Sequence, residues 1–263
     1  MVQMKDRIKE RAFSSPIPSA ISAALFAVVI FSVPSLFKVQ KDWLFALNLF
    51  CRAVAVVFAF VLAKKCGFKM FAKPKITLSA ILLSLLGFIV CVNNFPIIGF
   101  STGKVKLLTN PDIVEYLCYC VAIGVAEEAV FRGFIMPLIG IGLRERNRAP
   151  FFTVVLSAGI FALCHIFNIF SAGVVPTLLQ VGYTFLTGCL FGTVYLFTEN
   201  IVCPIILHTV YDLGGLIFTS PFGVAAGNMW DTYTVIITAV LGVITAAIFA
   251  FKLWNYKAGG LRT

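Results

Sequence analysis

Residues 149–198 read APFFTVVLSAGIFALCHIFNIFSAGVVPTLLQVGYTFLTGCLFGTVYLFT, a run of 50 residues without one Asp, Glu, Lys or Arg. About 20 apolar residues are enough for a helix to cross the hydrocarbon core of a bilayer. The run is long enough for two crossings, and the segment SAGVVP (171–176) favours a turn between them. This stretch predicts a polytopic α-helical membrane protein.

The rest of the chain has the same character. The whole chain is 60% apolar and only 12% charged, with a mean hydropathy of +0.99, whereas soluble domains carry about 25% charged residues. We expect an all-α fold, a transmembrane helical bundle of about eight spans. The absence of a repeat or linker predicts one integral-membrane domain over residues 1–263. The predicted spans are roughly 17–37, 43–63, 76–96, 112–135, 150–170, 175–197, 201–219 and 233–253.

The basic residues lie mainly in every second connection between the predicted spans. Eight spans put both termini on one side, and if that side is the cytoplasm, 15 Lys and Arg lie inside and 4 outside. The inside residues are Lys5, Arg7, Lys9, Arg11, Lys64, Lys65, Lys69, Lys73, Lys75, Arg144, Arg146, Arg148, Lys252, Lys257 and Arg262; the outside ones are Lys38, Lys41, Lys104 and Lys106. This bias predicts that both termini are cytoplasmic and supports an even number of spans. We expect a multi-pass protein of a bacterial plasma membrane.

The net charge of +10 does not indicate a nucleic-acid partner, because the positive residues sit in short loops between spans. We expect these loops to contact anionic membrane lipid. The eight cysteines include no CxxC pair and lie mostly within spans, so they are interpreted as small apolar residues. The sequence does not predict an oligomeric state.

Charged and titratable groups at membrane depth are few. Such groups are costly in hydrocarbon and normally face a protein interior or a water-filled cavity. Spans one, three and eight have none, so the embedded groups are expected to converge on one central site. They are Arg52 in span two, Glu127, Glu128 and Arg132 in span four (AEEAVFRGF, 126–134), His165 in span five, and His208 and Asp212 in span seven.

Helical spacing separates the two glutamates of span four. Residues four apart lie on one helix face, so Glu128 and Arg132 are predicted to pair. Glu127 points about 100° away and has no local cation. A carboxylate in a low-dielectric site without a cation holds a proton more readily, which is the property wanted in a general acid or base near neutral pH.

The two histidines of the chain add to this carboxylate. By the same spacing His208 shares a face with Asp212. Glu127, His165 and His208 could be three ligands of a divalent metal such as zinc, with water in the fourth position. Alternatively, Glu127 and one histidine polarise water directly, and the other histidine stabilises the oxyanion. Either arrangement predicts amide hydrolysis by water.

Other interpretations remain open. No G-x-S-x-G motif supports a serine nucleophile, and Cys164 beside His165 is expected to face away. Arg52 is expected either to take part in function or to form an ion pair with Asp212 or a glutamate. Asn168 is expected to form a hydrogen bond between two helices. The embedded groups also suit a proton- or cation-coupled transporter, although no pair of broken helices is visible. A third alternative is a non-catalytic immunity or scaffold protein.

Three short motifs occur in order along the second half of the chain. EEAVFR (127–132), FALCH (161–165) and HTVYD (208–212) resemble the motifs EExxxR, FxxxH and HxxxN/D of the CPBP (Abi) intramembrane proteases. That family includes the type II CAAX prenyl endopeptidases and bacterial bacteriocin-processing or self-immunity proteins. The resemblance covers about residues 110–220, which would be the protease motif core.

The resemblance implies cleavage of a peptide bond in a membrane-associated substrate, either CAAX-type or of the bacteriocin or peptide type, and so a peptide or lipidated-protein partner. It also implies a metalloprotease, with a divalent metal on Glu127, His165 and His208 as the only expected cofactor. The implied roles are water activation by Glu127 with His165, support by the Glu128–Arg132 pair, and oxyanion binding by His208 and Asp212.

Position 212 departs from the CAAX-type pattern, which has asparagine there. An ionised aspartate accepts hydrogen bonds and cannot donate one to an oxyanion. Asp212 is therefore expected to be protonated, to orient His208 or to bind a metal. A CAAX substrate is accordingly one possibility among others.

Overall fold

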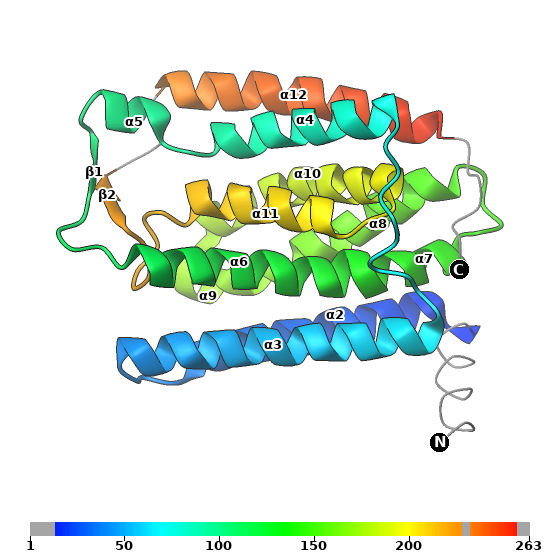
Figure 1. The fold of residues 1–263 in the computed structure, drawn as a ribbon, viewed down its shortest axis with the longest axis horizontal. Helices are drawn as coiled ribbons and strands as arrows, with labels where there is room; N and C mark the ends of the chain where they lie inside the picture. Colours follow the sequence, from blue (N-terminus) through cyan, green and yellow to red (C-terminus); the bar gives the residue numbers. More distant parts are fainter. Residues whose placement is uncertain (1–13, 228–231, 257–263) are drawn as a thin grey trace.

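The computed structural model describes residues 14–227 and 232–256 and is a bundle of helices (Figure 1). Its longer helices are α2 (Pro16–Ser32), α3 (Lys41–Cys66), α4 (Leu78–Asn93), α6 (Ile113–Val130), α8 (Ala149–Leu163), α10 (Val174–Thr198), α11 (Val202–Gly215) and α12 (Thr232–Trp254). The shorter ones are the 3₁₀ turn η1 (Val33–Leu36), α5 (Ile97–Ser101), the π-helical turn η2 (Phe131–Ile135), α7 (Met136–Gly142), the 3₁₀ turn η3 (Cys164–Asn168) and α9 (Ile169–Ala172).

The helices form three groups. Figure 1 shows α2 and α3 along one side of the bundle, α4 and α12 along the opposite side, and α6, α8, α10 and α11 between them. The contacts agree, because α3 packs on α6, α6 on α11, α11 on α4, and α10 on α8 and α12. The helices that carry the three motifs therefore lie in the middle of the bundle.

Residue choice explains where several helices begin and end. Prolines near the first turn start α2 and α8, where a missing N–H costs nothing. The Asp112 side chain accepts a hydrogen bond from the backbone N–H of Glu115 at the start of α6. Gly67 ends α3 with φ of 84°, a left-handed conformation that glycine adopts without strain.

Small residues bring helices close together where the site forms. A Cβ atom on Gly124 of α6 would lie 2.6 Å from Thr209 Oγ1 of α11 and 3.3 Å from the carbonyl oxygen of Ile205. Such a contact is too short for any side chain, so only glycine lets α6 and α11 approach this closely. Glu127 and Glu128 lie one turn along α6 from this contact, and His208 precedes Thr209 on α11.

The prediction of an all-α membrane bundle is confirmed, whereas the number of eight spans is only approximate. Among the described residues, α4 and α11 are short, at 16 and 14 residues, and α6 carries several charges. Five helical segments are long and apolar enough to cross a membrane, at Pro16–Leu36, Lys41–Cys66, Ala149–Ala172, Val174–Thr198 and Thr232–Trp254.

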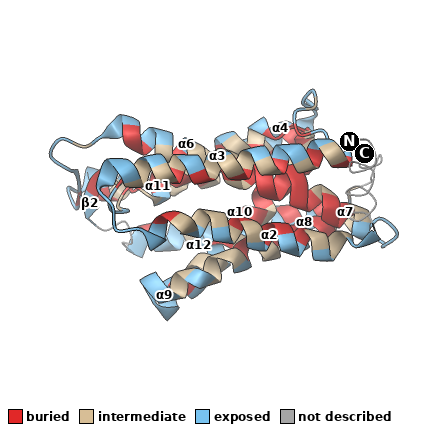
Figure 2. Ribbon diagram, turned by 90° about the horizontal axis from the view of Figure 1, so that it is seen from below, coloured by how far each residue is buried: buried red, intermediate tan, exposed pale blue. Residues whose placement is uncertain are grey.

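Large apolar side chains cover the outside of the bundle. Leu25, Val29, Phe50 and Val57 are all more than half exposed, and Figure 2 shows exposed residues on the outer helix faces with buried ones where helices meet. An aqueous surface would not tolerate so much contiguous apolar area. The chain is an integral membrane protein.

A short antiparallel strand pair was not predicted from the sequence. β1 (Val105–Leu107) pairs with β2 (Ala225–Gly227), with Lys106 opposite Ala226. Strands of three residues carry no usable period, and the partners are more than 110 positions apart in the chain. The pair joins the connection after α5 to the segment after α11 at one end of the bundle.

The bundle has a basic end. Figure 1 shows that α2 begins and α12 ends at the same end, where α3 also ends and the α7–α8 connection lies. Of the 15 predicted inside residues, Lys5, Arg7, Lys9, Arg11, Lys257 and Arg262 lie outside the described residues. The others include Lys64, Lys65 and the arginines 144, 146 and 148. We propose that this end faces the cytoplasm.

Tags at both termini are expected to resist external protease in intact cells and to be cleaved once the cells are permeabilised. The reason is the positive-inside bias, which holds both ends on the cytoplasmic side. A reporter inserted into the connection after α5 should behave in the opposite way. A terminal tag that is cleaved in intact cells would contradict the orientation.

Candidate functional site

The first motif lies where α6 changes into a π-helical turn. Glu127 and Glu128 are in the last turn of α6, and Arg132 is in η2. A π-helical turn inserts an extra residue into the helical ladder, and such turns are frequent at functional sites. The predicted pair is formed despite this insertion, with Arg132 Nη1 2.7 Å from Glu128 Oε1.

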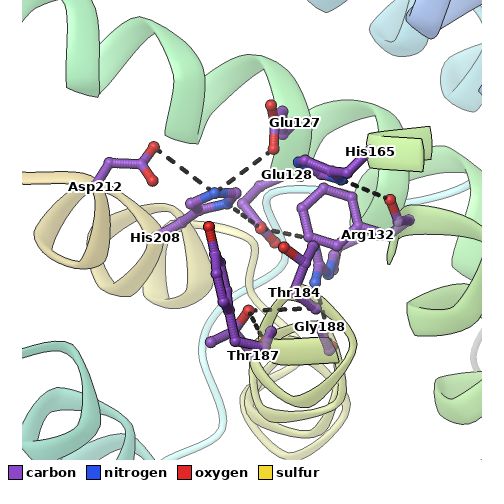
Figure 3. A network of polar contacts seen from close by, with 11 residues as sticks. Glu127, Glu128, Arg132, His165, Thr184, Thr187, Gly188, His208 and Asp212 are labelled. Carbon is purple, nitrogen blue, oxygen red and sulfur yellow. Dashed lines mark hydrogen bonds and ion pairs between the residues drawn. The ribbon is translucent and has the colours of Figure 1, made fainter. Parts of the chain in front are cut away.

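Glu128 is the centre of a buried polar network. Its side chain is 0% exposed, and its Oε1 atom accepts hydrogen bonds from Arg132 Nη1 and from His208 Nδ1, both at 2.7 Å (Figure 3). Arg132 Nη2 also donates to the carbonyl oxygen of Gly188 on α10, at 3.2 Å. Glu128 therefore joins α6 to α11 and, through Arg132, to α10.

The second ring nitrogen of His208 faces two further carboxylates. His208 Nε2 lies 3.6 Å from Glu127 Oε2 and 3.7 Å from Asp212 Oδ2. These separations are longer than a direct hydrogen bond. Within the part of the chain that the structure describes, Asp212 Oδ2 is buried without a hydrogen-bond partner. His208 thus has one nitrogen fixed by Glu128 and the other directed at Glu127 and Asp212.

His165 approaches from the second motif, in η3. Its Nδ1 lies 3.1 Å from the carbonyl oxygen of Phe161, one turn earlier. A carbonyl oxygen can only accept, so Nδ1 carries the hydrogen, and in the neutral ring Nε2 keeps its lone pair. The Phe161 ring packs edge-on against His165, with centroids 5.2 Å apart, and fills the space between the two histidines.

Aromatic rings enclose the buried arginine. The guanidinium carbon of Arg132 lies 4.7 Å from the Phe161 ring centre and 5.7 Å from that of Phe191. Phe191 also packs against His208, at 5.2 Å. Phe191 and the Gly188 carbonyl were not found by sequence reasoning, since one phenylalanine among 27 carries no signal and a backbone carbonyl carries none at all.

A pocket opens beside Glu127 and His165. Its wall is formed by α2, the end of α6, η2, α8 and η3, and its lining residues are Ala27, Val28, Phe31, Ser32, Glu127, Phe131, Phe161, Cys164, His165, Phe167 and Asn168. Cys164, which was expected to face away from His165, lines the same pocket. Four of the five residues of η3 contribute to this pocket.

Three further polar residues near the site or in the loops, Asn168, Glu199 and Arg52, make contacts of different kinds. Asn168 bonds between helices as predicted, because its Nδ2 atom donates to Gln180 Oε1 of α10 at 2.8 Å, and it lines the pocket as well. Glu199 forms an ion pair with Lys75. Arg52 has no carboxylate within ion-pair distance among the described residues, so the expected pairing with Asp212 or a glutamate is not made.

All three motifs therefore meet in one place in the middle of the bundle (Figure 3). Residues 109–214 match the family model described as type II CAAX prenyl endopeptidase, Rce1-like. This segment is similar to the Rce1-like family. No curated protein and no solved structure matches the chain.

The matched segment begins just before α6 and ends in α11, so it contains every residue of the three motifs. The match supports an intramembrane peptidase, and the family implies a membrane-associated peptide substrate. Helices α2, α3, α4 and α12 lie outside the matched segment, although α2 supplies part of the pocket wall.

The two histidines of the site share one feature with metal-binding histidines. In both histidines Nδ1 is engaged by an oxygen acceptor, which leaves Nε2 for a ligand or for water, as in many metal-binding histidines. Among residues 14–227 and 232–256, however, no group of three or more His, Cys, Asp and Glu side chains is gathered closely enough to hold an ion. The orientation of the rings suits a metal, but the spacing in this structure does not.

Proposed function

We propose that the chain is an intramembrane endopeptidase in which Glu127, together with His165, activates water for attack on a peptide bond of a membrane-associated substrate. The supporting observation is the contrast between the adjacent glutamates. Glu128 is fully buried and engaged by Arg132 and His208, whereas the Glu127 side chain is 18% exposed and lines the pocket with His165. Only Glu127 is placed to meet water and substrate.

In the proposed reaction a water molecule lies between the Glu127 carboxylate and His165. Because Nδ1 of His165 carries its hydrogen, Nε2 accepts a hydrogen bond from this water and helps to orient it. Glu127 takes the proton of the water as the oxygen attacks the carbonyl carbon. The same proton then passes to the amine leaving group as the C–N bond breaks.

His208 is assigned to the oxyanion that forms during this attack. Glu128 fixes the ring through Nδ1, so a proton on Nε2 can only be directed toward the space shared with Glu127 and Asp212. An N–H held in advance in this way stabilises developing negative charge. Asp212 orients this side of the ring. We therefore assign it a positioning role in place of the donor role that asparagine has in the CAAX-type pattern.

A divalent metal such as zinc remains a prediction from the family resemblance, with Glu127, His165 and His208 as its residues. Bound there, it would polarise the substrate carbonyl and lower the pKa of a bound water. The steps proposed above depend on the side chains of the chain alone. The substrate is proposed to be a membrane-associated peptide, prenylated or not.

Purified protein in liposomes is expected to cleave members of a library of labelled membrane-anchored peptides, and His165→Ala is expected to lower the rate about 100-fold or more. Cys164→Ala is the matched control, because it alters the neighbouring side chain of the same pocket and should leave cleavage nearly unchanged. Metal content measured on the same samples should fall in His165→Ala if the metal prediction is correct.

Two results would contradict the proposal. One is a folded wild-type protein that cleaves no peptide in the library. The other is loss of cleavage in Cys164→Ala with normal cleavage in His165→Ala, which would indicate a thiol nucleophile.

A further inference from the structure

Asn168 is the last residue of η3 and lines the pocket beside Glu127, but the reaction described above gives it no task. Most of the pocket lining is apolar, and the lining side chains that carry oxygen or nitrogen are Ser32, Glu127, His165 and Asn168. A peptide that enters such a pocket at membrane depth leaves water, so its backbone N–H and C=O groups need partners on the protein. The Asn168 amide is available for one of them.

The 3₁₀ conformation of η3 places Asn168 beside His165. Side chains three residues apart eclipse in a 3₁₀ helix, whereas in an α-helix they are offset around the axis. His165 and Asn168 have this spacing, and both line the pocket. With a rise of about 2.0 Å per residue, Asn168 lies about 6 Å along the turn from His165. An extended peptide covers about 3.3–3.6 Å per residue, so this offset corresponds to about two residues of a bound substrate.

The Asn168 amide is held in one orientation by α10. Its Nδ2 atom donates to Gln180 Oε1 at 2.8 Å, and α10 is itself joined to the site because the Gly188 carbonyl accepts a hydrogen bond from Arg132. The planar amide then leaves Oδ1 on its other side, and among the described contacts Oδ1 accepts no hydrogen bond. An amide oxygen accepts and does not donate, so the free atom matches a peptide N–H.

We propose that Asn168 binds the backbone of the substrate, with Oδ1 accepting a hydrogen bond from a peptide N–H within about two residues of the bond that is cut, and that Gln180 positions this amide. The contact involves the peptide backbone and does not depend on the side chains of the substrate. It holds the scissile carbonyl in place against the water between Glu127 and His165, which is the contribution of orientation to catalysis. This inference rests on the proposed function and adds one binding residue and one positioning residue to it.

The test uses one peptide that the wild-type protein cleaves in liposomes, together with a set of its ester analogues. In each analogue one backbone N–H within two residues of the cleaved bond is replaced by oxygen, and the cleaved bond itself stays an amide. An ester keeps nearly the same shape but has no donor. We expect one of the analogues to be cleaved with a kcat/KM about 3- to 10-fold below that of the parent peptide, because one neutral hydrogen bond is lost. Products are identified by mass, so that only cleavage at the amide is counted.

Asn168→Leu keeps the size of the side chain without its acceptor, so it is expected to cleave the parent and the sensitive ester at the same rate. Gln180→Leu leaves the Asn168 amide without its partner and should reduce the difference between the two peptides, whereas Gln180→Glu keeps an oxygen acceptor and should retain it. Ser171→Ala is the control, because it removes an exposed hydroxyl that bonds the backbone carbonyl of Asn168, and it should retain the full difference. If Asn168→Leu fails to fold in a thermal melt, Asn168→Ala takes its place.

Equal cleavage of the parent and of every ester by the wild-type protein would overturn the inference. So would an equal loss of rate on the parent and the sensitive ester in a folded Asn168 variant, which is the result expected of a purely structural residue. A full difference in Gln180→Leu would overturn the positioning role of Gln180. In each of these outcomes the peptide is still cut, so the proposed function stands. Cleavage of none of the peptides by wild type would count against the proposed function and, with it, this inference.

Discussion

Arg132→Met is expected to lower the Tm of the protein in detergent by about 6–20 °C. Arg132 and Glu128 are 1% and 0% exposed, and they are joined at 2.7 Å. Removing the arginine leaves a buried carboxylate with His208 as its only described partner. Breaking such a pair costs about 3–5 kcal/mol, and each kcal/mol corresponds to about 2–4 °C for a chain of this size. Methionine fills much of the vacated volume, so the loss reports on charge.

Two further variants isolate the cause. The double variant Glu128→Gln with Arg132→Met removes both charges and should recover part of the lost Tm. Arg144→Met is the matched control, because Arg144 pairs with Glu145 on the surface, where both side chains are more than 70% exposed. Such a pair is worth no more than about 1 kcal/mol. Equal melting of Arg132→Met and Arg144→Met would show that the buried pair does not stabilise the fold.

The membrane helices and the local pair could be predicted from the sequence. A bilayer forces the backbone to satisfy its own hydrogen bonds, so long uncharged runs become helices almost regardless of detail. The Glu128–Arg132 contact joins residues four apart and depends only on helical spacing, and it persists through the π-helical turn. The Asn168 bond to another helix is likewise made.

The partner of Glu128 across the bundle could not be predicted. His208 is 80 positions away, and its contact with Glu128 depends on how closely α6 and α11 pack at Gly124. From the sequence, the Glu128–Arg132 pair is expected to support Glu127. In the structure Glu128 also accepts a hydrogen bond from His208 and so fixes the position of that ring. The same long-range packing determines the position of Phe191 and the β1–β2 pairing.

The isolated position of Arg52 was also beyond sequence reasoning. Depth in the membrane predicted that this cation needs compensation, and a carboxylate of the chain was the simplest choice. The structure gives it an amide oxygen and two aromatic rings instead. Packing across the bundle decides which helix faces contact α3. The sequence of one span does not show which faces these are.

Glu127→Gln is expected to reduce peptide cleavage by about 10²–10⁴-fold, the usual contribution of a general acid or base. Glutamine keeps the shape and volume of the side chain, but it cannot take a proton from water. Glu127 makes no direct hydrogen bond within the described network, and its nearest ionisable contact is His208 Nε2 at 3.6 Å. The Tm of this variant should therefore remain close to that of wild type.

The most direct measurement of the central claim, that the two adjacent glutamates have separate tasks, compares Glu127→Gln and Glu128→Gln in cleavage and in thermal melting. Glu127→Gln should lose cleavage by about 10²–10⁴-fold and keep its Tm. Glu128→Gln should lower the Tm, because Arg132 is then buried without its counter-charge, and it should retain more cleavage than Glu127→Gln. Near-normal turnover in Glu127→Gln, together with an inactive Glu128→Gln that melts like wild type, would show that the two roles are assigned the wrong way round.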